Sequence, residues 1–123
     1  MYELMVRLDF SAAHRLNKYK GKCSRLHGHN WKVDLMLASA RLDKGEMVMD
    51  ATEVKKIGRK FLESIDHTYL NDMPYFKKKE STSENIAAFI YKRLKSDIPK
   101  LVKVRVWESD AVAIAFTGAA RSK

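Results

Sequence analysis

The chain has 123 residues, 46% of them hydrophobic, and its 24 lysines and arginines against 15 acidic residues give a formal net charge of +9. This length fits one domain with a real core, and the composition argues against global disorder. No stretch approaches the ~18 consecutive apolar residues that span a membrane, and the N-terminal segment carries acidic residues, so we expect neither a membrane association nor a signal peptide. The single cysteine, Cys23, excludes an intrachain disulfide and the usual thiolate-rich structural zinc sites, which favours a cytoplasmic protein.

The positive charge allows three interpretations: a solvated basic surface, a nucleic-acid-binding surface, or a site for a small polyanion. Basic residues gather around Cys23, in the loop from Lys18 to Arg25, and again at residues 77–79. The sequence has no paired Cys/His finger and no aromatic strand pair of the RNP type, so we expect no nucleic-acid partner.

Two strands and a helix are predicted in the first half of the chain. Residues alternate with period two from Tyr2 to Phe10 and from His29 to Ala38, which indicates an antiparallel pair with one buried side. Met47–Met49 is a candidate for a further short strand. Asp50 stands where an N-cap would, and apolar residues at helical spacing predict a helix from about Thr52 to Ser64.

The second half mirrors this order. Residues 66–79 are irregular, several capping residues follow, and a second amphipathic helix is expected to end before Pro99. Leu101–Glu108 predicts a strand with its valines and Glu108 on one face, and Ala111–Gly118 predicts its hairpin partner. The expected fold is α+β, a single domain over residues 1–118 in ββααββ order with two helices on one face of a four-stranded antiparallel sheet, and residues 119–123 form a tail.

Three histidines form the strongest chemical pattern. His27 and His29 point to the same side of a strand, and His14 follows the strand that should pair with it. Ordinary hydrogen-bonded histidines explain the His27–His29 pair by itself better than a metal does. Together with His14 and the nearby Cys23, the interpretation as a catalytic zinc site with three imidazoles and one open position becomes the better one.

Other residues leave more than one interpretation open. Cys23 could be a fourth ligand, an inert thiol or a reactive thiolate, and the surrounding basic residues favour the last. Asp66 could orient His67, or His67 could simply follow a helix end. Glu108 could be solvated at the rim, or could accept hydrogen bonds from a ligand with two adjacent N–H donors.

These motifs occur in an order that resembles a known family. Phe10–His14, Cys23–Asn30, Asp66-His67, Thr82–Ala87 and Trp107–Ser109 together are similar to the 6-pyruvoyl-tetrahydropterin synthase and 6-carboxy-tetrahydropterin synthase family. The resemblance covers nearly the whole chain. It implies the tunnelling fold, in which three subunits close a twelve-stranded barrel and two trimers stack into a homohexamer with active sites between subunits.

The resemblance also implies residue roles. His14, His27 and His29 would bind Zn2+, Cys23 would accept a proton, and Asp66 with His67 would relay protons on the other side of the substrate. Glu108 would anchor the amino-pyrimidine edge of a pterin, with help from Thr82 and Ser83.

Several activities share this scaffold and the substrate 7,8-dihydroneopterin triphosphate. Only three residues separate Cys23 from His27, as in the bacterial 6-carboxy-tetrahydropterin synthases of queuosine biosynthesis, whereas pyruvoyl synthases of the animal type have a longer gap. No glutamate occurs between Tyr19 and Asn30, which argues against a branch that makes a folate precursor. We therefore expect a lyase that releases triphosphate and acetaldehyde. The alternatives are a pyruvoyl synthase on the same scaffold and a basic RNA-binding module with a structural metal.

Overall fold

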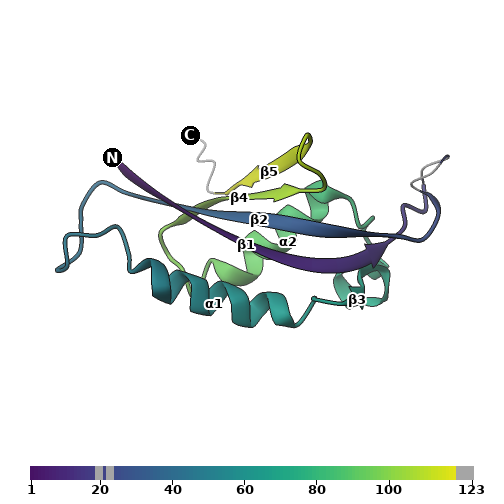
Figure 1. The fold of residues 1–123 in the computed structure, drawn as a ribbon, viewed down its shortest axis with the longest axis horizontal. Coiled ribbons are helices and arrows are strands. Elements are labelled where there is room, and N and C mark those ends of the chain that lie inside the picture. The colour runs from purple at the N-terminus through teal and green to yellow at the C-terminus, as the bar shows by residue number, and fades with distance from the viewer. Residues whose placement is uncertain (19–20, 22–23, 119–123) are drawn as a thin grey trace.

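Two layers make up the structure, a computed structural model that describes residues 1–18, 21 and 24–118: a sheet, and a pair of helices against one of its faces (Figure 1). The elements are β1 (Tyr2–His14), β2 (His27–Ser39), α1 (Ala51–Glu63), β3 (Thr68–Tyr69), the 3-10 turns η2 (Leu70–Asp72) and η3 (Pro74–Lys77), α2 (Ser83–Leu94), β4 (Leu101–Trp107) and β5 (Ala113–Thr117). The predicted α+β class is confirmed. Neither α1 nor α2 is long and apolar enough to cross a membrane. The predicted tail, residues 119–123, lies outside the described residues.

The long antiparallel pair β1–β2 forms the centre of the sheet. All thirteen residues of each strand are paired, from Tyr2 opposite Ser39 to His14 opposite His27. Alternate side chains point toward the helices, and Phe10 of β1 stacks on Trp31 of β2 with ring centroids 5.9 Å apart. The period-two pattern of the sequence therefore predicted both the pairing and the buried face.

Helix α1 lies close against this pair. Its predicted N-cap is confirmed, since the Asp50 carboxylate accepts a hydrogen bond from the Thr52 N–H at 2.9 Å. At Gly58 the helix meets the sheet so closely that an added Cβ would lie 2.6 Å from Cδ1 of Leu8 and 3.0 Å from Cδ1 of Leu35. The missing side chain is thus what allows α1 to approach the strands.

The structure corrects the sequence-based prediction in three places. Strand β3 makes a fifth strand in the order β3-β1-β2-β4-β5 and runs parallel to β1 over two residues, where an irregular segment was expected. Residues 47–49 form bends rather than a strand. In β4 a bulge makes Val102 an extra residue, because Met36 pairs with Lys103 whereas Leu37 pairs with Leu101. The alternation had predicted that Val102 shares the buried face of Val104. Because of the bulge, it does not.

A buried carboxylate ties three strands together on the sheet face opposite the helices. Asp34 of β2 is 0% exposed; it accepts hydrogen bonds from Arg7 of β1 at 2.6 and 3.1 Å and from the Trp107 indole of β4 at 2.8 Å. Arg105 approaches to 3.6 Å. Burial alone would raise the pKa of Asp34, but these donors outweigh it and hold that pKa below its ordinary value.

The close contact at Gly58 yields a prediction about stability. Gly58→Val should lower the free energy of unfolding by about 1–3 kcal/mol, because the branched side chain overlaps the leucines beneath it. Urea denaturation measures the change. Lys55→Val, at an exposed position of the same helix, is the matched control and should cost only about 0.5 kcal/mol. Equal losses in the two variants would contradict the tight approach.

Candidate active site

The pairing of β1 with β2 brings three histidines together at one end of the sheet. His14 lies directly opposite His27, and His29 is two residues further along the same face of β2. Their potential ligand atoms all lie within 4.8 Å of one another. The ring centroids are 4.5 Å apart for His14 and His27, 5.3 Å for His14 and His29, and 4.9 Å for His27 and His29. The predicted three-histidine grouping is therefore present in the structure.

Backbone carbonyls fix which ring nitrogen is available in two of these histidines. Nδ1 of His14 lies 2.7 Å from the carbonyl oxygen of Ser81, and Nδ1 of His27 lies 2.7 Å from that of Arg25. A carbonyl can only accept, so each Nδ1 carries the proton and each Nε2 keeps its lone pair. Nε2 of His14 is buried and has no hydrogen-bond partner among the described residues. A buried nitrogen with a free lone pair fits a metal ligand whose other ring nitrogen is held by the protein.

Burial keeps His14 and His29 in the form that binds metal. It lowers the pKa of His14, and the neighbouring histidines lower it further against the opposing effect of the Ser81 carbonyl. Burial also lowers the pKa of His29, opposed by the negative charge of Glu108. Both imidazoles are therefore neutral near pH 7.

The donor set indicates the class of metal. Among the described residues, these histidines form the one group of three or more potential ligand side chains, and all its donors are imidazole nitrogens. Imidazole suits zinc and other transition metals, whereas magnesium and calcium prefer oxygen. Cys23, predicted as a proton acceptor or a ligand, lies outside the described residues.

Asp66 and His67 are held against the edge of β1 by the backbone of Ser11. The Ser11 N–H donates to Oδ1 of Asp66 at 2.8 Å, and the His67 N–H donates to the Ser11 carbonyl at 2.5 Å. Oδ1 of Asp66 also lies 3.2 Å from Nδ1 of His67, so the carboxylate and the imidazole do touch. The Ser11 hydrogen bond lowers the pKa of Asp66, which favours the ionised form that can orient an imidazole.

The backbone of His67 is unusual as well. Its φ of 59° places a non-glycine residue in the left-handed region, at a cost of roughly 1 kcal/mol or more. The side chain is 81% exposed, so burial of the ring does not compensate for this strain. The hydrogen bond from the His67 N–H to the Ser11 carbonyl holds the conformation instead, and the imidazole points away from the core.

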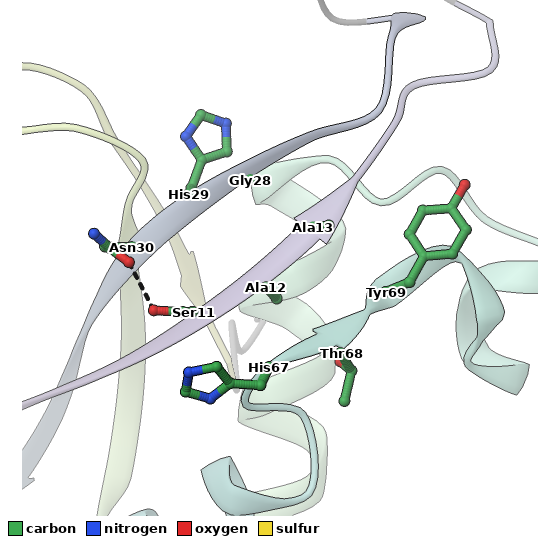
Figure 2. Close-up of a pocket in the computed structure, with 9 residues that line it drawn as sticks. All are labelled: Ser11, Ala12, Ala13, Gly28, His29, Asn30, His67, Thr68 and Tyr69. Carbon is green, nitrogen blue, oxygen red and sulfur yellow. Dashed lines mark hydrogen bonds between the residues drawn. The ribbon is translucent and has the colours of Figure 1, made fainter.

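One cleft has both His67 and His29 among its lining residues. It has a volume of about 490 Å³ and lies where β1, β2 and β3 meet (Figure 2). Its lining residues are Ser11, Ala12, Ala13, Gly28, His29, Asn30, His67, Thr68 and Tyr69. Figure 2 shows His67 and Tyr69 beyond the edge of β1, and Ser11 bonded to Asn30 across the two strands. His29 is the residue shared by the cleft lining and the histidine group.

The remaining predicted residues lie close by but differ in what they contact. Glu108 is half-buried in the bend after β4, one residue beyond the end of the strand, and its charge reaches His14 and His29. Thr82 is the N-cap of α2, its hydroxyl accepting from the Asn85 N–H at 3.2 Å. Ser83 is buried, and its hydroxyl has no partner among the described residues.

Sequence reasoning missed the residues that orient the others. Ser81 holds the ring of His14 and Ser11 holds both Asp66 and His67. Both act through backbone groups, which every residue type except proline provides in full. Trp31, by contrast, could be placed near the histidines from the sequence, because it follows His29 by two residues on the same strand face. Its ring centroid is 5.1 Å from that of His14 and 4.9 Å from that of His29.

Comparison with known proteins gives a consistent result. The sequence profile described as 6-pyruvoyl tetrahydropterin synthase matches residues 3–119. The chain is 36% identical to the 6-carboxy-5,6,7,8-tetrahydropterin synthase of Synechocystis, covering 94% of this chain and 93% of that protein. It is 35% identical to the 6-pyruvoyl tetrahydrobiopterin synthase of Homo sapiens, covering 91% and 88% respectively.

Solved structures agree. The 6-pyruvoyl tetrahydropterin synthase of Caenorhabditis elegans superimposes with a TM-score of 0.86 at 32% identity, covering 95% of each chain. The Plasmodium vivax enzyme of the same name gives 0.76 at 24% identity, which supports the fold alone. The expected tunnelling fold of the subunit is thereby confirmed.

The lowered pKa values predict how the metal-free protein responds to acid. His14 and His29 titrate below the ordinary value of about 6.5 when folded, so the unfolded chain binds more protons as the pH falls. The contribution of these two histidines to the free energy of unfolding is complete above about pH 6.5 and is lost progressively below it. Urea denaturation with a chelator at about pH 7.5 and 5.5 measures this loss. A His14→Gln/His29→Gln variant should lose less stability between these two pH values. A loss equal to that of the unaltered protein would contradict the lowered pKa values of the two histidines.

Proposed function

Because the chain belongs to the 6-pyruvoyl tetrahydropterin synthase family, we propose that it is a zinc-dependent 6-carboxy-5,6,7,8-tetrahydropterin synthase. In this reaction 7,8-dihydroneopterin triphosphate and water give 6-carboxy-5,6,7,8-tetrahydropterin, acetaldehyde and triphosphate, on the way to 7-deazaguanines such as queuosine. The observation that carries the proposal is the three-histidine group, with its buried and unpartnered His14 Nε2, beside a cleft that also contains His67.

In this proposal His14, His27 and His29 hold the zinc ion. When bound, zinc supplies Lewis acidity that lowers the pKa of hydroxyl groups on the substrate side chain. The protein contributes the orientation of the ligands, because the carbonyls of Ser81 and Arg25 select the Nε2 lone pairs of His14 and His27. Trp31 packs beneath the rings and separates them from the core.

Proton transfer falls to Cys23 and to the Asp66–His67 pair. Oδ1 of Asp66 lies 3.2 Å from Nδ1 of His67. In this proposal the carboxylate keeps the proton on Nδ1, which leaves Nε2 as the nitrogen that exchanges a proton with the substrate. The strained backbone of His67 and the hydrogen bond from its N–H to the Ser11 carbonyl set the direction of the ring. Cys23 acts as the proton acceptor in this proposal, and the lysines and arginines near it in the sequence favour its thiolate.

Glu108 provides the anchor for the pterin ring. A carboxylate has two acceptor oxygens and can receive two parallel N–H bonds from an amino-pyrimidine edge. Its charge reaches the same histidines that hold the metal, which fits one ligand extending from Glu108 to the metal. Thr82 and Ser83 are the secondary contacts in this proposal. The unpartnered hydroxyl of Ser83 makes it the better candidate, since Thr82 is engaged in capping α2.

The choice of product rests on the spacing of Cys23 and His27. Relatives named for the carboxy and for the pyruvoyl reaction match at nearly equal identity, 36% and 35%, so similarity does not favour either. The three-residue gap resembles the carboxy branch. The pyruvoyl reaction removes triphosphate and keeps the carbon chain. It is the second candidate, because relatives named for it are almost equally similar to this chain.

We also propose that the active form is a homohexamer, a dimer of trimers with sites between subunits. The exposure of His67, 81% in the single chain, supports this. A proton-relay imidazole works best where water is excluded, and a neighbouring subunit over the cleft would exclude it.

Two single substitutions test the division of roles. His29→Ala should lose both zinc and turnover, because one of three ligands is gone. Cys23→Ala should retain zinc and lose about 10²–10⁴-fold in turnover, since only the proton acceptor is removed. Metal content by atomic absorption and release of triphosphate give the two readouts. Loss of zinc from Cys23→Ala would make Cys23 a ligand rather than a base.

Product analysis tests the reaction itself. With 7,8-dihydroneopterin triphosphate, the zinc-loaded protein should release acetaldehyde and triphosphate in equal amounts, measured by a coupled dehydrogenase assay and by phosphorus NMR. The His29→Ala variant serves as the inactive control. Triphosphate without acetaldehyde would establish the pyruvoyl reaction instead.

A further inference from the structure

Lysines make up half of the residues that line a second hollow. It has a volume of about 340 Å³, and four of its lining side chains are Lys18, Lys77, Lys78 and Lys79. We propose that this hollow is the subsite for the oligophosphate group of the substrate. The inference rests on the proposed function for the identity of the ligand, but the hollow predicts an oligophosphate site of its own.

The balance of charge in the hollow favours an anion. Among the described residues, only Lys77 of the four lysines approaches a carboxylate, that of Asp72 at 3.9 Å. Glu80 is the one acidic residue in the lining. One of its carboxylate oxygens is occupied by the backbone N–H groups of Asn17 at 2.6 Å and Lys18 at 3.4 Å. Glu80 therefore holds the backbone that lines the hollow, and the ammonium groups of the lysines can bind a ligand.

The two chain segments that form the hollow are joined to each other and to the histidine site. Arg15 and Asn71 exchange two hydrogen bonds, at 3.0 and 2.9 Å, and the Ser81 hydroxyl donates to the Arg15 carbonyl at 3.2 Å. The Ser81 carbonyl in turn holds the ring of His14 at 2.7 Å. The segment after His14 and the segment before Ser81 thus form one unit that contains both the ligand histidine and the lysines.

The distance between the two sites suits one extended substrate. Asn17 lines the hollow and follows His14 by three residues, so their Cα atoms lie at most about 11 Å apart. A substrate whose reacting carbons lie at the histidines could therefore place its phosphates at the lysines. Asn85, in the first turn of α2, also lines the hollow, and the partial positive charge of a helix start favours an anion there.

The test measures binding of inorganic tripolyphosphate to the zinc-loaded protein by calorimetry. A Lys18→Gln/Lys78→Gln/Lys79→Gln variant removes three charges from the hollow. A Lys44→Gln/Lys55→Gln/Lys92→Gln variant removes three charges from exposed positions elsewhere. We expect binding about tenfold weaker or more in the hollow variant and changed by less than about twofold in the control. Substrate KM should rise by a similar factor in the hollow variant alone.

The outcomes separate this inference from the proposed function. Equal weakening in both triple variants would show that net charge alone attracts the anion, and would overturn the subsite. Unchanged binding and unchanged KM in the hollow variant would overturn it as well. Selective weakening in the hollow variant, in a protein that turns over no pterin, would uphold the oligophosphate site and reject the pterin reaction. The single variant Lys78→Glu provides the same comparison if the triple variant folds poorly.

Discussion

The register between β1 and β2 is the constraint on which the rest of the site depends. Side chains alternate along a strand, so a slip of one residue would turn every buried group of one strand to the opposite face. In the observed register His14 faces His27, and the same alternation brings His29 and Trp31 to that face. The stacked Phe10 and Trp31 and the close approach of α1 at Gly58 both depend on this alignment. Burial of the core and assembly of the three imidazoles therefore depend on the same strand register.

Backbone groups, rather than side chains, carry out most of the orientation around this site. The carbonyl of Ser81 holds one histidine, and the amide and carbonyl of Ser11 hold Asp66 and His67. The site thus draws on the chain before α2 and on the chain after α1, two segments of irregular structure. Each segment is fixed by its contact with the end of β1, so the strand serves as the common reference for groups that lie far apart in the sequence.

The sequence predicted the elements whose residues repeat with a clear period. The two central strands, the helix capped by Asp50 and the grouping of three histidines all follow from alternation or spacing. The bulge at Val102 could not be predicted, because it depends on which residue of β2 lies opposite. Strand β3 has only two residues, too few for a period to appear. The contact between Asp66 and His67 needed the position of Ser11, which no pattern in their own segment reveals, and Cys23 stays a prediction.

The hydrogen bonds of the Ser11 backbone to Asp66 and His67 also limit where a further strand can add to the sheet. On its outer side β1 pairs with β3 only at Ala12 and Ala13, and the backbone groups of Ser11 are already used by Asp66 and His67. On this side of β1, an incoming strand from another molecule could therefore form a ladder only along the first part of the strand, before Ser11. Such a strand would stop just short of the cleft, so a neighbouring chain joined there would border the cleft opening without filling it.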